Sequence, residues 1–174
     1  RQKIAWAELL RGHTEAYHEQ MDRLEKRGNN RAGGDRNATK ESEREAPPNL
    51  SLLRARLLFD GAYFERARSD MDALDPNQMA TPEEELEYYY RTGRILHGLK
   101  DFDGALSFYE RTISIGAADD SFFACNSALQ AGLIEEERGN NTRAKAYFNR
   151  CLSLNPDEYK AGLHLQAKAG LDRI

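Results

Sequence analysis

Residues 132–156 read GLIEEERGNNTRAKAYFNRCLSLNP, and this stretch decides the fold. The small residue Gly132 is followed twelve positions later by Ala144, and the large apolar Phe148 comes four positions further on. The sequence Gly139-Asn140-Asn141 between them is typical of a turn. Two antiparallel helices produce this pattern when their backbones approach at the small residues and larger side chains fill the space around the contact. The stretch therefore predicts a helical hairpin that ends at Pro156.

The same spacing occurs twice upstream, at shifts of 39 and 38 residues. In order of small residue, Ala and large residue, the upstream copies are Gly93, Ala105 and Tyr109, and then Ala55, Ala67 and Met71. Repetition at a fixed period indicates stacked copies of one supersecondary unit. We therefore expect three hairpins at about 50–76, 82–116 and 121–155, followed by a capping helix over 157–174.

The composition also favours helices. The 174 residues include 22 Ala and 20 Leu but only six Ile and no Val. Strands depend on β-branched and aromatic side chains, whereas Ala and Leu are among the best helix formers. The predicted fold class is all-α.

Local signals predict where the helices begin and end. Thr81-Pro82-Glu83-Glu84 is a capping box with proline at the first helical position. Asp101 can cap the helix that ends at Gly116. Asn155-Pro156-Asp157-Glu158 follows the same logic and predicts a helix start. Among Tyr88, Tyr89 and Tyr90, which a helix spreads around its circumference, we expect Tyr89 to enter the core.

The N-terminal part is less regular. Ala5, Gly12 and Met21 keep the hairpin spacing within residues 1–27, but Tyr17 stands where Ala is expected, so this hairpin is degenerate. From residue 25 to residue 49 the chain has no large apolar residue. Such a segment cannot offset the entropy of ordering by burial. We expect residues 28–49 to be a polar loop or linker, and residues 28–46 of it to be dispensable for folding.

At this point the repeats resemble the tetratricopeptide repeat, which pairs a small residue in its first helix with Ala in its second and ends on Pro. The match is closest in the third copy. The second copy departs from it at Lys100, where the turn Gly is usual, and at Ala117, in place of the closing Pro; the first departs at Arg54. The resemblance implies hairpins stacked in a right-handed α-solenoid. It also implies a concave groove, lined by the first helix of each hairpin, that binds a protein or peptide.

Residues 88–116 and the ending AKAGLDRI at 167–174 also resemble the C-terminal repeat segment of uncharacterised multi-repeat bacterial proteins of this superfamily. The resemblance implies that the chain is part of a longer protein. It leaves the compartment, cytoplasmic or exported, undecided.

The register of the repeats selects the groove residues. Positions next to the small residue, and three or four residues away on the same face, are expected to face the groove: Arg56, Phe59, Tyr90, Arg94, His97, Asn126 and Leu133. Two arginines beside aromatic rings suit a peptide with an acidic and an apolar residue, because guanidinium binds carboxylate bidentately and stacks on rings. Equally, both arginines can be solvated and paired with Asp60 or Glu87. The Lys and Asn residues of the clamp with which related domains hold chaperone tails are missing.

Other functions have less support in the sequence. We expect a non-enzymatic scaffold without a metal or cofactor, because the four histidines are scattered and no nucleophile or phosphate-loop motif occurs. The alternatives left open are a structural spacer or self-association module, and a scaffold within a glycan-binding protein or an enzyme.

The net charge of −4 and the lack of a basic block argue against nucleic acid as a partner. No run is long enough to insert in a membrane. Cys151 is expected in the core and Cys125 either in the core or as a free thiol, while a single disulfide between the two stays open.

Overall fold

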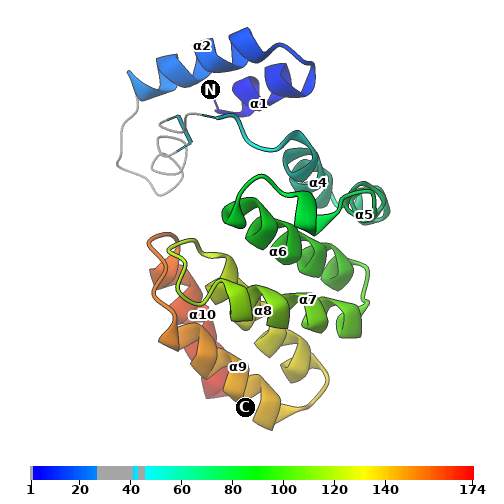
Figure 1. Ribbon diagram of the computed structural model, residues 1–174. Coiled ribbons are helices and arrows are strands. Elements are labelled where there is room, and N and C mark those ends of the chain that lie inside the picture. Colours follow the sequence, from blue (N-terminus) through cyan, green and yellow to red (C-terminus); the bar gives the residue numbers. More distant parts are fainter. Residues whose placement is uncertain (1, 27–40, 43–45) are drawn as a thin grey trace. The chain divides into compact units, whose positions relative to one another are not determined.

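The computed structural model describes residues 2–26, 41–42 and 46–174, and within these ranges it is built from helices without a strand (Figure 1). The helices are α1 Gln2–Leu10, α2 Thr14–Glu25, α4 Leu50–Asp60, α5 Phe64–Asp72, α6 Pro82–Gly98, α7 Phe102–Ile115, α8 Phe123–Glu137, α9 Asn141–Ser153 and α10 Lys160–Arg173, with a short 3-10 helix η1 at Pro76–Gln78. The chain divides into two compact units, Arg1–Arg54 and Ala55–Ile174. The second unit is an all-α helical repeat solenoid.

In the first unit, α1 and α2 form one hairpin whose core is aromatic and aliphatic. Ala5, Trp6 and Leu9 of α1 and Tyr17 and Met21 of α2 are all at most 5% exposed. Tyr17 thus occupies the place that a small residue has in the other hairpins.

One described residue of the polar segment contacts this hairpin. Glu41 accepts hydrogen bonds from Trp6 Nε1 at 2.6 Å and from Gln2 Nε2 at 2.5 Å. Glu41 thus ties the segment to α1, because a charged acceptor pairs there with a buried indole, while the expectation that the segment is dispensable for folding stays a prediction. The rest of the predicted loop up to residue 40, together with residues 43–45, lies outside the described residues.

The turn between the two helices of each hairpin is the same in all four. One residue with positive φ stands seven positions after the small residue in each copy: Gly12 at +83°, Ala62 at +60°, Lys100 at +65° and Gly139 at +74°. The next residue is the N-cap of the second helix, and its N–H donates to the carbonyl five residues earlier: His13 to Glu8, Tyr63 to Leu58, Asp101 to Leu96 and Asn140 to Glu135. These are the bonds of a Schellman cap, which satisfy the free carbonyls at a helix end. The turn therefore fixes the register of each hairpin independently of its side chains.

Close contact in the second unit occurs where the sequence places small residues. A Cβ on Gly93 would lie 2.8 Å from the Tyr109 ring, and one on Gly132 would lie 2.5 Å from the Phe148 ring. Both rings are fully buried, at 0% exposure. Ordinary carbon contacts are about 3.5–4.0 Å, so only glycine leaves room for these rings. The aromatic residue of each hairpin thus packs on the backbone of the first helix.

The end of the solenoid is covered by α10, which packs against α8 and α9. Leu163, Ala167 and Gly170 of α10 are buried, whereas Ala161 and Ala169 are exposed. The helix starts at Lys160, so the prediction of a start at Pro156 is wrong. Residues 154–159 instead form a connection in which the Asp157 N–H donates to the Asp120 carbonyl at 2.9 Å.

The other local signals give a mixed result. Thr81 Oγ1 accepts from the Glu84 N–H at 3.1 Å, and Asp101 Oδ1 accepts from the Gly104 N–H at 3.1 Å, as predicted. The Glu84 carboxylate reaches back to the Ala80 N–H at 3.0 Å instead of to Thr81. The prediction for Tyr89 is wrong, since it is half-buried while Tyr88 and Tyr90 are buried.

Candidate functional site

Three helices of the second unit contribute to a continuous set of polar and aromatic contacts around Arg94. Arg94 and Tyr90 lie one turn apart on α6, Phe59 lies in the last turn of α4, and Asn126 lies in the first turn of α8. Residues four apart on a helix share a face, which places Tyr90 beside Arg94. We call Phe59, Tyr90, Arg94 and Asn126 the Arg94 site.

The Arg94 guanidinium is half-buried between two rings. Its Cζ lies 4.9 Å from the centre of the Phe59 ring and 5.9 Å from that of Tyr90, and Nη1 donates a hydrogen bond to the Tyr90 hydroxyl at 2.9 Å. Burial disfavours the charge, but the neighbouring Tyr90 and Asp60 raise the pKa of Arg94 above its ordinary value. Among the described residues no carboxylate lies within 4.0 Å of the guanidinium. The site therefore holds a permanent positive charge on a platform of neutral groups.

The Tyr90 hydroxyl links this charge to α8. It accepts a second hydrogen bond, 2.7 Å long, from Asn126 Nδ2, and Asn126 Oδ1 accepts one from Gln130 Nε2 at 3.2 Å. With both lone pairs of its oxygen engaged, Tyr90 has its own proton left to donate. No acceptor for that proton occurs in the part of the chain that the structure describes.

His97 lies one turn further along α6 and faces α7. Its Nδ1 is 3.3 Å from the Tyr109 hydroxyl, and its ring meets that of Phe102 edge to face at 5.6 Å between centres. Burial, followed by the charges of Arg94 and Lys100, lowers the pKa of His97 below its ordinary 6.5. The imidazole is consequently neutral at pH 7, and Arg94 carries the charge of this surface.

Besides His97, two other predicted groove residues do not join the Arg94 site. Arg56 forms an ion pair with Asp60, which lies four residues along α4, at 4.0 Å. Leu133 packs against the core around Phe148. Arg56 thus pairs with Asp60, as the alternative in the sequence analysis expected. Glu87, the other carboxylate that was considered, is instead hydrogen-bonded to Arg91 Nε at 2.5 Å. The two arginines occupy the same repeat position but have different partners.

An aromatic group beside the site was missed by sequence reasoning. The Tyr90 ring lies 4.9 Å from the Phe123 ring and 5.6 Å from the Phe122 ring, and Phe122 meets Tyr159 edge to face at 5.1 Å. Phe122 precedes α8 and Phe123 is its first residue. Their position four and three residues before Asn126 was the sequence signal that they would lie near the site. Gln130 was also missed, although its spacing of four from Asn126 on a helix predicts contact.

The residues that carry the repeat signature lie where hairpin packing needs them. Eight are buried, namely Ala55, Ala67, Gly93, Ala105, Tyr109, Gly132, Ala144 and Phe148; Pro156 is buried and Gly139 is the exposed turn residue with positive φ. They position the helices of the hairpins.

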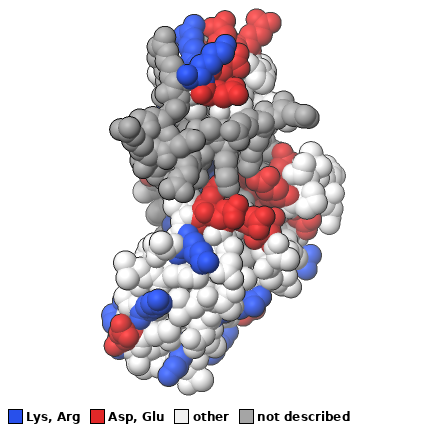
Figure 2. All heavy atoms as spheres, turned by 90° about the vertical axis from the view of Figure 1, so that its left-hand side faces the viewer, with Lys and Arg blue, Asp and Glu red and all other residues white. Residues whose placement is uncertain are grey.

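Charged side chains are spread thinly over part of the surface. Figure 2 shows one face, on which the Lys and Arg side chains of the second unit are scattered and most of its Asp and Glu side chains lie in one area. In the described ranges no helix is long and apolar enough to cross a membrane, and no group of three or more His, Cys, Asp or Glu side chains is arranged to hold a metal ion.

Comparison with known proteins identifies the repeats. Residues 86–116 and 126–158 each match the family described as tetratricopeptide repeat. No curated protein and no solved structure gave a significant match. The matched segments cover most of the α6–α7 and α8–α9 hairpins, including the Gly93–Tyr109 and Gly132–Phe148 contacts. These two hairpins are tetratricopeptide repeats.

Proposed function

We propose that the chain is a scaffold that binds a peptide segment of a partner protein through the first helices of its hairpins, and that Arg94 receives a carboxylate of that segment. Repeats of this superfamily generally mediate interactions between proteins. The observation that supports the finer proposal is the half-buried Arg94 guanidinium, whose hydrogen-bond partner within the protein is a neutral hydroxyl. A buried or half-buried charge is usually paired with an opposite charge. A ligand carboxylate would supply that charge.

The chemistry of the site fits an acidic residue next to an apolar one. A guanidinium has five N–H donors in a planar fork, and the Tyr90 hydroxyl takes only one bond from Arg94. A carboxylate can accept two parallel bonds from the fork and a third from the Tyr90 O–H. The Phe59 ring beside the guanidinium offers apolar surface for the neighbouring ligand side chain. Neutral His97 adds no competing charge near pH 7.

The test uses synthetic peptides, since the natural ligand is unidentified. Fluorescent hexapeptides with one Asp or Glu next to Phe or Leu are screened by fluorescence anisotropy, each beside its Asn or Gln counterpart. The variant Arg94→Gln removes the charge and keeps a polar side chain. Arg91→Gln is the matched control, because Arg91 lies on the same helix and is already bonded to Glu87. Circular dichroism shows whether each variant keeps the fold.

We expect the acidic peptides to bind wild type and Arg91→Gln alike, and Arg94→Gln about 10- to 100-fold more weakly. That factor corresponds to the roughly 1.5–3 kcal/mol of a hydrogen bond to a charged group. Equal affinity of Arg94→Gln, or equal binding of acidic and amide peptides, contradicts the proposal. Absence of peptide binding together with concentration-dependent sedimentation of the chain favours the alternative of a self-association module.

A further inference from the structure

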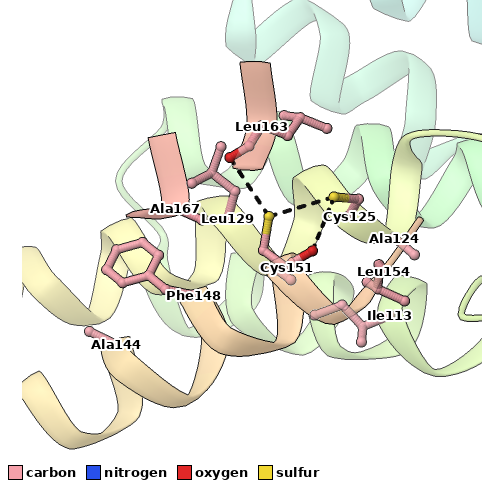
Figure 3. Packing of buried hydrophobic residues seen from close by; sticks show 11 residues of the cluster. Ile113, Ala124, Cys125, Leu129, Ala144, Phe148, Cys151, Leu154, Leu163 and Ala167 are labelled. Atoms are coloured by element: carbon pink, nitrogen blue, oxygen red, sulfur yellow. Dashed lines mark hydrogen bonds between the residues drawn. The ribbon is translucent and has the colours of Figure 1, made fainter. Parts of the chain in front are cut away.

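Two cysteines from the two helices of the last hairpin meet inside the core. Cys125 on α8 and Cys151 on α9 are 1% and 0% exposed, and both are free thiols. Their sulfur atoms are 3.5 Å apart, and Cys125 Sγ also lies 3.5 Å from the Cys151 carbonyl oxygen (Figure 3). A disulfide bond is about 2.05 Å long, so the sulfurs need to approach by about 1.5 Å to form one.

The pair is covered by the terminal helix. Leu163 and Ala167 of α10 belong to the same buried cluster as the cysteines, and Cys151 Sγ lies 3.9 Å from the Leu163 carbonyl oxygen (Figure 3). If α10 lifts away from α8 and α9, this cover over the sulfurs is removed. Access of a reagent to the thiols therefore depends on how firmly α10 is docked.

Two polar contacts hold α10 besides its apolar face. Arg173 Nε and Nη2 donate to the two carboxylate oxygens of Glu136 on α8, at 2.6 and 2.7 Å. His164 Nε2 lies 2.9 Å from the Leu154 carbonyl oxygen. The Arg173 clamp is the more accessible of the two, because the Arg173 side chain is 50% exposed.

We propose that Cys125 and Cys151 are a dithiol that is oxidised to a disulfide within the hairpin by exchange with a small-molecule disulfide, and that docking of α10 controls the rate. The Cys125 thiolate attacks one sulfur of the reagent RSSR, forms a mixed disulfide and releases RS⁻. The Cys151 thiolate then attacks Cys125 Sγ and releases the second RS⁻. In sum, the two thiols lose two protons and two electrons, and RSSR is reduced to two RSH.

The environments of the two sulfurs agree with this order of attack. The hydrogen bond with Cys151, with help from the charge of Lys160, lowers the pKa of the Cys125 thiol, although burial acts against it. The same hydrogen bond and burial raise the pKa of Cys151. With α10 docked, Cys125 is thus the sulfur that is more readily ionised.

The experiment treats the full chain with bis(2-hydroxyethyl) disulfide, a small uncharged reagent, and then alkylates the remaining thiols in denaturant. We expect loss of both thiols, a mass lower by about 2 Da and a linked pair of tryptic peptides containing Cys125 and Cys151. The oxidised chain should unfold at a temperature higher by about 5–10 °C. Cys125→Ala, which cannot form the bond, should show no such shift.

Control by α10 is tested by the rate of thiol loss. Arg173→Ala removes the clamp and should speed oxidation about 2- to 10-fold, whereas Lys168→Ala, at an exposed position of the same helix, should leave the rate unchanged. Equal rates in these two variants overturn the role of α10. Two free thiols in wild type and in Arg173→Ala after prolonged treatment, a stable reagent adduct, or a disulfide between chains overturns the proposed bond.

Discussion

Replacing Gly132 by Ala tests the contact on which the hairpin packing rests. The added Cβ would lie 2.5 and 2.6 Å from two ring atoms of Phe148 and 3.2 Å from a third. The ring cannot retreat, because a Cβ on Gly170, which belongs to α10, would meet it at 2.6 Å. Phe148 is thus enclosed between the backbones of α8 and α10. The methyl group must displace one of these elements.

The expected magnitude combines two opposing effects. Alanine is favoured over glycine in a helix interior by about 0.5–1 kcal/mol. Overpacking of a filled core costs about 1–3 kcal/mol. The matched control is Gly162→Ala in α10, where a Cβ would have no atom within 4 Å, so only the favourable effect applies. The two variants should therefore differ in free energy of unfolding by about 1–3 kcal/mol, with Gly132→Ala the less stable.

The assay is urea unfolding followed by circular dichroism, with the midpoint and the slope compared between variants. A smaller side chain at position 148 separates a steric effect from any other. Phe148→Leu should reduce the loss of stability caused by Gly132→Ala, and a double-mutant cycle should give a coupling of at least about 1 kcal/mol. Equal stability gains in Gly132→Ala and Gly162→Ala would refute the enclosed position of the ring.

Three further outcomes follow from local contacts. Lys100→Gly and Ala62→Gly should each raise the free energy of unfolding by about 0.5–1 kcal/mol, because positive φ is strained in residues with a Cβ; thermal unfolding measures this. Because the pKa of His97 is lowered in the folded chain, the unfolded chain binds a proton there first as the pH falls. The free energy of unfolding should therefore be full above pH 6.5 and decrease below it. Urea midpoints measured over this range should decrease less in His97→Gln than in wild type. Glu41→Ala should destabilise the first unit by about 1–2 kcal/mol, with fluorescence of Trp6, the only tryptophan, as readout.

The hairpins were predictable from sequence because their packing is a matter of volume. A glycine in one helix and an aromatic residue in the other form a simple sequence pattern, as at Gly132 and Phe148. The sequence signal of the turns is weaker. Ala62 and Lys100 adopt the positive φ of Gly139 because the backbone hydrogen bonds of the turn require it, whatever side chain is present. The turn can therefore be predicted from residue type only where the residue with positive φ is glycine.

The start of α10 was not predictable from its cap signal. Asn155-Pro156-Asp157-Glu158 can begin a helix, but the Asp157 N–H is bonded to the Asp120 carbonyl, 37 positions away in the chain. A tertiary bond of this kind outweighs a local preference, since capping contributes only about 1 kcal/mol. The same limit applies to Glu41, whose partners on α1 could not be read from its polar surroundings.

The difference between the two groove arginines, by contrast, was available in the sequence. A helical residue reaches the side chain four positions away, and that position holds Asp60 after Arg56 but Gly98 after Arg94. The carboxylate nearest in sequence on the other side, Glu87, is four residues from Arg91 and is bonded to it. Neighbour spacing within one helix thus separates an arginine with an ion-pair partner from one whose hydrogen-bond partner is a neutral hydroxyl.

The terminal helix connects the core to the Arg94 site. Tyr159, the residue before α10, meets the Phe122 ring, which in turn meets Tyr90, the acceptor of the Arg94 hydrogen bond. Each of these contacts joins rings of different elements, so displacement of α10 removes a wall of the aromatic group on which Tyr90 rests. A partner that binds at Arg94 gains from a fixed Tyr90 hydroxyl, because less conformational entropy is lost on binding. Docking of α10 therefore bears on the recognition that we propose at Arg94 as well as on the stability of the last hairpin.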